Sequence, residues 1–268
     1  FGPDSMTWRV HAELPSMLAG GLCALMLQLL HPRALAGVYD HSNFRQDLVG
    51  RLRRTTAFVA GTTYAPTAEV EKLVSRVRRI HANVRGSVDG VPYAADDPAL
   101  LTWVHVTEAY GFLQGFRRYG RAVPGPLADR YYDEYRRVAE ALGATGVPRS
   151  EAEVDAWFAL QQPQLRLDER AREVLQVLQS VRLPVPVPGL SRDVFLGAAA
   201  ALLPPWAGEM LEQGTRQRLQ ARASMRVLQG AAPLFRRALP DGLASRACAR
   251  MGVGVGVLKV WPGGGRDD

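Results

Sequence analysis

The chain has 268 residues, of which 47% are hydrophobic and 22% are charged, a composition typical of a globular protein with a large core. Its net charge of +7 comes almost entirely from scattered arginines, because Lys72 and Lys259 are the only lysines. Since nucleic-acid sites gather their cations into runs or stripes, we expect no nucleic-acid partner. The two cysteines, Cys23 and Cys248, form no C-x-x-C pair, which excludes a zinc ribbon or a thioredoxin-like redox motif.

The N-terminal region predicts neither secretion nor a membrane span. Residues 1–10 lack the basic start and apolar run of a secretory signal, and we therefore expect a cytoplasmic protein. The most apolar segment, residues 14–30, would extend ~26 Å as a helix, which is shorter than the ~30 Å hydrocarbon core of a bilayer. We therefore expect no transmembrane span and interpret the segment as a buried core helix, with a membrane-facing helix as the alternative.

Helical signals follow one another along most of the chain. Pro32 ends the first helix, Asp97 and Pro98 begin another, and Ser150 forms a capping box with Glu153. Apolar residues recur at steps of three and four inside these segments, which is the period of a helix. The expected helices span residues 16–30, 41–64, 66–86, 96–120, 127–143, 150–162, 167–180, 192–206 and 212–239.

Strand signals are rare by comparison. Only "VGVGVLKV", residues 253–260, alternates with the period of a strand. The proline-rich segment 184–189 is short and is followed by apolar helices, so we interpret it as a turn within one domain. We predict an all-α fold, with a single multi-helix domain over residues 1–262 and a disordered tail over residues 263–268.

Several common catalytic signatures are absent from the sequence. It contains no P-loop and no G-x-S-x-G elbow, and the glycines of residues 252–257 precede no helix that would make them a dinucleotide site. A di-iron bundle needs two Glu-x-x-His pairs, but none of the five histidines has a glutamate three positions before it. His105 and Glu108 show only the reverse order, for which an ion pair at an exposed edge is the ordinary account.

Three histidines are candidates for a functional site. His81 lies on the apolar stripe of the expected helix 66–86, His105 can point inward from the helix 96–120, and His41 lies beside a helix start. The ordinary account of His81 and His105 is a neutral core histidine with hydrogen-bonded nitrogens, and that of His41 is a helix cap. The stripe around His81 consists of Val74, Val77, Ile80 and Val84.

Arginines form the second group of candidates. The segment "RLRRT" places Arg51, Arg54 and Thr55 on one helix face, because they are three and four residues apart. Arginines on an inward face need anionic partners, since a buried unpaired charge is costly. The candidate anions are Asp40, Asp47, Glu108 and the carboxylates of a bound ligand. The alternative is a solvated arginine face.

The order and spacing of several segments resemble one protein family. These segments are "LQLLHPRALAGVYDHSNF", "RLRRTTAF", "IHANVRG", "YAADDPALLTWVHVTEAYGFL", "RYYDEYRRVAEALG" and "VPRSEAEVDAWF". The family comprises the rubber oxygenases called latex clearing proteins and the mycophenolic-acid-pathway oxygenase that cleaves a farnesyl side chain. The resemblance extends to residue 206, and it is greatest to compact bacterial members of unassigned activity.

The resemblance implies an all-α protein that binds haem b. The family's proximal iron ligand is a histidine that matches His81, and its arginine and threonine near the haem match Arg51 and Thr55. The lysine that can occupy the distal side in rubber oxygenases is replaced by Arg54, which does not readily lose its proton to bind iron. The family's glutamate base has no counterpart between residues 13 and 69, and this departure weighs against polyisoprene cleavage; Asp40 and His41 are the nearest substitutes.

The haem propionates would supply anions for inward arginines. The candidates for these contacts are Arg51, Arg54, Arg78 and Arg85, whereas Arg76 and Arg79 are expected to face water. His105 is expected to line the pocket or to support the ligand. The catalytic candidates are Arg54, Thr55 and His41, which would polarise dioxygen or peroxide.

We therefore expect an oxidoreductase, an oxygenase or peroxygenase, that acts on an apolar small molecule. One alternative is a haem-binding sensor or carrier without turnover. The other is a cofactor-free all-α interaction protein, in which His81 is a core histidine.

Overall fold

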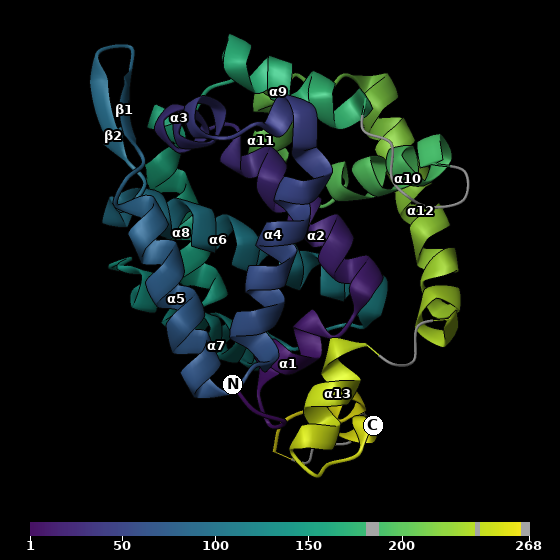
Figure 1. Ribbon diagram of the computed structural model, residues 1–268. Helices are drawn as coiled ribbons and strands as arrows, with labels where there is room; N and C mark the ends of the chain where they lie inside the picture. The colour runs from purple at the N-terminus through teal and green to yellow at the C-terminus, as the bar shows by residue number, and fades with distance from the viewer. Residues whose placement is uncertain (181–187, 239–241, 264–268) are drawn as a thin grey trace.

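The computed structural model describes residues 1–180, 188–238 and 242–263, and it confirms an all-α fold (Figure 1). Its helices are α1 (Met6–His11), α2 (Leu14–Gln28), α3 (Pro32–His41), α4 (Phe44–Tyr64), α5 (Thr67–His81), α6 (Pro98–Gly115), α7 (Gly125–Leu142), α8 (Glu151–Gln161), α9 (Glu169–Ser180), α10 (Pro188–Ala200), α11 (Pro205–Met210), α12 (Thr215–Ala238) and α13 (Leu243–Arg250). A π-helical turn, Phe116–Gly120, continues α6, and an antiparallel hairpin pairs β1 (Arg85–Val88) with β2 (Val91–Ala94).

The core is built around α2 and α6, which cross in direct backbone contact. A Cβ atom added to Gly111 would lie 2.3 Å from the carbonyl oxygen of Gly20, and one added to Gly115 would lie 2.4 Å from that of Ser16. Small residues at the crossing therefore let the two helices approach closely. Their larger apolar neighbours, such as Leu27, Trp103 and Leu113, are fully buried.

Replacing Gly111 with alanine is expected to destabilise the fold by about 2 kcal/mol or more, because the new methyl group forces α2 and α6 apart. Urea unfolding measures the change. Gly230→Ala is the matched control, since a Cβ at this helical glycine meets nothing within 4 Å and should stabilise the chain slightly. Equal stability of the parent and Gly111→Ala would contradict the close helix contact.

Local signals placed several helix starts correctly. The Asp97 side chain accepts a hydrogen bond from the backbone nitrogen of Ala99, and the Ser150 side chain accepts one from that of Glu153. The expectation that a helix ends before Pro32 is confirmed, but a second helix, α3, starts at this proline and was not expected. Proline suits the first turn of a helix, and His31 caps this one by accepting from the nitrogen of Ala34.

The expected end of one helix was also wrong. The helix expected over residues 66–86 ends at His81, and residues 85–94 form the hairpin, whose turn residues Asp89 and Gly90 have φ angles of 52° and 75°. An Asp-Gly pair readily adopts this left-handed turn, so the sequence did carry a hairpin signal. Conversely, the alternating segment near the C terminus forms no strand and contains a 3₁₀ turn, Val255–Lys259.

The C-terminal segment packs against the N-terminal helix. Arg9 of α1 is buried, and its guanidinium donates to the carbonyl oxygens of Val257 and Val260, as well as to those of Pro3 and Ser5. Trp8 and Cys248 are fully buried in one cluster beside this contact. Residues 184–187 of the expected proline-rich turn and residues 264–268 of the expected tail lie outside the described residues.

Within the described part of the chain, no single helix is both long and apolar enough to cross a membrane. Only α2 and α3 together pass a test of length and composition, and they meet at 105°.

Candidate functional site

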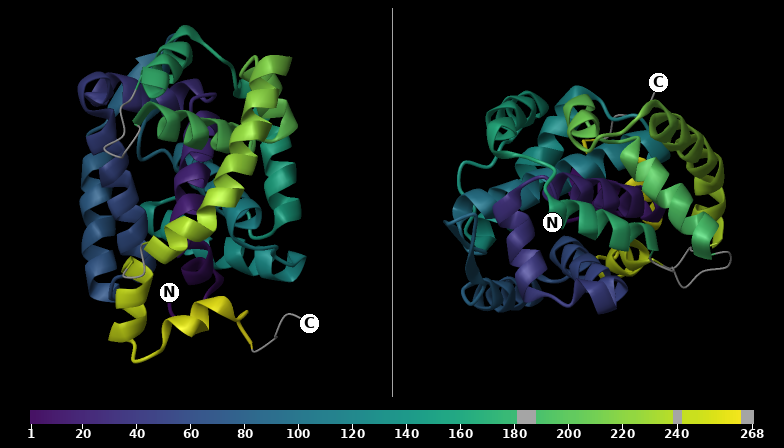
Figure 2. Two further views of the ribbon diagram at one scale, coloured as in Figure 1. Left: turned by 90° about the vertical axis from the view of Figure 1, so that its right-hand side faces the viewer. Right: turned by 90° about the horizontal axis from the view of Figure 1, so that it is seen from above.

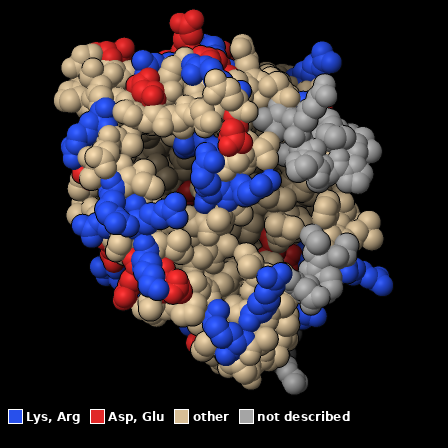
Figure 3. Space-filling model, viewed as in Figure 1, with Lys and Arg blue, Asp and Glu red and all other residues tan. Residues whose placement is uncertain are grey.

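The helices α4 and α5 form an antiparallel pair, which places Arg54 of α4 and His81 of α5 at a similar distance from the turn between the helices. A Cβ atom at Gly61 would lie 2.5 Å from Cδ1 of Leu73, so the two helices touch near the turn that joins them. Each residue advances a helix by about 1.5 Å, and Arg54 and His81 are therefore at a similar height above this contact. Away from the turn the helices diverge (Figure 1), and the surface is hollowed between them, with basic side chains around the opening (Figure 3).

The inner face of α5 lines this hollow. Val70, Leu73, Val77 and His81 of this helix are partly buried rather than fully buried, as is Val84, which follows the helix. The prediction of a fully buried stripe around His81 was wrong. Only Val74 is buried, and Ile80 is 53% exposed, because α5 has solvent on its outer side.

The His81 imidazole is the last side chain of α5 and has no hydrogen bond within the described part of the chain. Its Nδ1 is buried without a partner. Burial lowers the pKa of His81, and Asp96 opposes this shift only in part. The ring is therefore neutral at neutral pH, which is the protonation state that binds a metal.

The three candidate side chains of the segment "RLRRT" differ in exposure: Arg51 is half-buried, whereas Arg54 and Thr55 are exposed. Arg51 is half-buried and has no ion pair or hydrogen bond from its guanidinium among the described residues, and burial and the charge of Arg54 lower its pKa. Arg54 is more exposed and pairs with Asp47 at 3.4 Å, one of the anions that the sequence suggested. The hydroxyl of Thr55 is exposed and donates to the carbonyl oxygen of Arg51.

The remaining predicted basic residues lie at the edge of the site. Arg85 donates to the Asp96 carboxylate at 2.8 Å, and its side chain is 60% exposed. Arg78 is exposed on α5, as are Arg76 and Arg79, which were expected to face water. Because α5 ends at His81, Arg85 lies beyond the helix, at the start of β1.

His41 does not cap a helix, and that prediction was wrong. It is the last residue of α3, and its Nε2 lies 3.1 Å from the carbonyl oxygen of Arg85 and 3.2 Å from the hydroxyl of Tyr93. The imidazole therefore joins α3 to the hairpin. This contact fixes the segment that follows His81.

His105 lies on α6 in an aromatic and polar layer. Its ring centre is 4.7 Å from that of Tyr135, and burial lowers its pKa to about 3. In the same layer, His11 is hydrogen-bonded to the hydroxyls of Thr63 (2.7 Å) and Tyr131 (3.0 Å). Both ring nitrogens of His11 therefore have a partner, a role that the sequence pattern around this residue did not indicate.

Glu108 is the residue whose importance the sequence analysis missed. It lies one turn after His105 and is the only acidic residue of α6. It has no hydrogen bond or ion pair among the described residues, and burial raises its pKa to about 7. A lone acid in a mostly apolar helix was the signal, but the sequence suggested only an ion pair for it, with an arginine or with His105 at an exposed edge, and the burial of the unpaired carboxyl contradicts both. At neutral pH this carboxyl is divided between its protonated and ionised forms.

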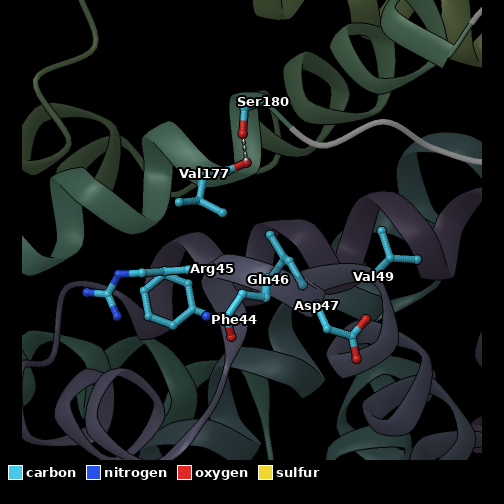
Figure 4. A pocket seen from close by; sticks show the side chains of 8 residues that line it. Phe44, Arg45, Gln46, Asp47, Val49, Val177 and Ser180 are labelled. Carbon is cyan, nitrogen blue, oxygen red and sulfur yellow. Dashed lines mark hydrogen bonds between the residues drawn. The ribbon is translucent and has the colours of Figure 1, made fainter.

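Two concave surfaces lie elsewhere on the molecule. One, of about 240 Å³, lies between the start of α4 and the end of α9, and Phe44, Asp47 and Val177 line it (Figure 4). The other, of about 870 Å³, lies beside Tyr110, Phe158 and Trp206. Neither contains any of the predicted histidines, so the candidate site remains the hollow between α4 and α5.

The described residues contain no group of three or more histidine, cysteine or acidic side chains arranged to hold a metal ion. The family model of the ER-bound oxygenase mpaB/B′/rubber oxygenase catalytic domain matches residues 8–236 of the chain. No curated protein and no solved structure matches the chain.

Proposed function

Because the chain belongs to the ER-bound oxygenase mpaB/B′/rubber oxygenase family, we propose that it is a haem b-dependent oxidoreductase of the oxygenase or peroxygenase type. Its substrate would be an apolar small molecule, with dioxygen or peroxide as the oxidant. The observation that carries the proposal is the neutral imidazole of His81, which has no partner within the described chain and follows Val74 and Val77 on α5.

The residues present fit a haem with a single protein ligand. A haem iron needs only one protein side chain in addition to the porphyrin nitrogens, so the absence of a larger cluster of ligating side chains in the described residues is compatible with it. His81 can supply that ligand, since ring nitrogens without hydrogen bonds are available to iron and to an acceptor that orients the ring. Bound haem would supply the redox-active iron that activates the oxidant.

The arginines divide into strong and weak candidates for the propionates. Arg51 is the strongest, because a half-buried guanidinium without a protein partner is otherwise costly and a carboxylate would neutralise it. Arg54 would have to share its charge with Asp47, and Arg85 with Asp96. Arg78 has the freedom of an exposed side chain and would close over the opening.

The chain's own groups would prepare the site for chemistry on an apolar substrate. The valines of α5 would give the substrate an apolar surface, and the neutral ring of His105 would add no charge to the layer in which it packs against Tyr135. Glu108 can hold or release a proton near neutral pH, and so can take the part of the glutamate base that is missing before Arg51. Thr55 and His41 are fixed by hydrogen bonds to backbone carbonyls and would act from the rim.

The test is to load the purified chain with haem and record its absorption spectrum. We expect a Soret band with one haem per chain, followed by oxidised products when the loaded protein receives dioxygen or peroxide and a panel of apolar alkenes and terpenoids. Mass spectrometry would then separate cleavage from hydroxylation.

A folded protein that binds no haem would overturn the proposal in favour of a cofactor-free interaction protein. Stoichiometric haem without turnover across the panel would instead favour a sensor or a carrier. The control is haem added to an equal concentration of serum albumin, which reports nonspecific uptake.

A further inference from the structure

Helix α12 is strongly basic and lies on the outside of the molecule. It carries six arginines and no acidic residue, and Figure 2 shows it lying along the outside of the molecule. Its arginines are Arg216, Arg218, Arg222, Arg226, Arg236 and Arg237. A helix with this composition is strongly attracted to anionic surfaces.

The helix is apolar on both faces. Ala221, Leu228 and Ala232 are buried on its inner face, which packs against α10 and α2. A second apolar row faces solvent on the opposite side: Leu219 is 59% exposed, Val227 56% and Leu234 67%. At about 100° per residue these positions fall within one sector of the helix surface that is about 80° wide, so they share one face. The packing of the described chain does not explain this outer row.

The charges lie beside the outer row. Arg222, Arg226 and Arg237 are exposed on one flank and have no ion pair among the described residues. Arg236, by contrast, pairs with Glu13 at 2.9 Å.

We propose that the outer face of α12 docks on the surface of a bilayer that contains anionic lipids. Leu219, Val227 and Leu234 would enter the boundary between headgroups and acyl chains, and the flanking arginines would contact lipid phosphates. The arginines alone would suit either a nucleic acid or an anionic membrane. The row of exposed leucine and valine side chains favours the membrane, because its surface is both anionic and apolar. The inference depends on neither haem nor the proposed reaction.

The test is co-sedimentation of the full chain with vesicles. We expect binding to vesicles of phosphatidylcholine mixed with phosphatidylglycerol, little binding to phosphatidylcholine alone, and loss of binding at high salt. Val227→Asp and Arg226→Glu should each weaken binding by about tenfold or more. Circular dichroism would confirm that the variants fold.

Matched controls are Leu160→Asp, at a leucine that is 75% exposed on α8, and Arg76→Glu, at an exposed arginine on α5. Both should bind vesicles as the parent does. Equal binding by the α12 variants and the parent would overturn the proposal, and so would binding without dependence on anionic lipid. A dimer that Val227→Asp dissociates, in a chain that ignores vesicles, would assign the face to a second copy instead.

Discussion

Replacing His81 with alanine is expected to remove the Soret band of the haem-loaded protein. Loss of groups that merely orient a metal ligand already weakens binding about 10- to 100-fold, so loss of the ligand itself should exceed about 100-fold. The haem-free fold should change little, by less than about 1 kcal/mol, because the imidazole makes no hydrogen bond among the described residues and is only half-buried. Haem titration and urea unfolding measure the two effects separately.

Three comparisons locate the ligand. Arg79→Ala changes an exposed residue in the same turn of α5 and should retain the Soret band, while His105→Ala should retain haem with a shifted spectrum. In a His81→Gly chain, added imidazole should restore the band by occupying the space of the lost ring. Full haem content in His81→Ala with loss of haem in His105→Ala would transfer the assignment to α6.

Replacing Glu108 with glutamine is expected to stabilise the protein at alkaline pH. In the folded chain, burial holds the pKa of this carboxyl at about 7, compared with an ordinary value of 4.5. Folding therefore disfavours ionisation, and stability is lost as the pH rises from the unfolded pKa to the folded one. The glutamine variant has no such loss, and it should exceed the parent by on the order of 3 kcal/mol at about pH 8 and by about 1 kcal/mol at about pH 5.

Urea unfolding at the two pH values tests this expectation. Glu71→Gln is the matched control, since Glu71 is exposed on α5 and the same change there should alter stability little at either pH. A Glu108→Gln chain that is less stable than the parent at the higher pH would show that the carboxylate has a favourable partner. It would also remove Glu108 as a proton donor or acceptor for the proposed reaction.

Much of the helical framework could be predicted from local chemistry. Asp97 and Ser150 begin helices because a side-chain oxygen beside the first turn accepts a free backbone N–H, which is a property of a few consecutive residues. Errors arose where one residue supports two structures. Pro32 suits both the residue after one helix and the first turn of the next, and Asp89-Gly90 follows a segment whose valines fit a helix equally well.

The candidate site was less predictable, because its character depends on how two helices diverge. The sequence placed His81 and Arg51 on suitable helix faces, but it could not show that α5 would be half-exposed or that Arg54 would pair with Asp47. The altered pKa of Glu108 depends on burial by residues distant in sequence. The link between these helices and an oxygenase came from the resemblance to a family, whose model matches residues 8–236.

The hydrogen bonds of Arg9 to the C-terminal segment show that the end of the family match differs from the end of the folding unit. The family model ends at residue 236, but two acceptors of the Arg9 guanidinium are carbonyl oxygens of Val257 and Val260, beyond that limit. A chain shortened at the limit of homology would leave a buried cation short of acceptors and would uncover Trp8, which packs with Cys248. The last part of the chain therefore belongs to the folding unit, although it lies outside the family match.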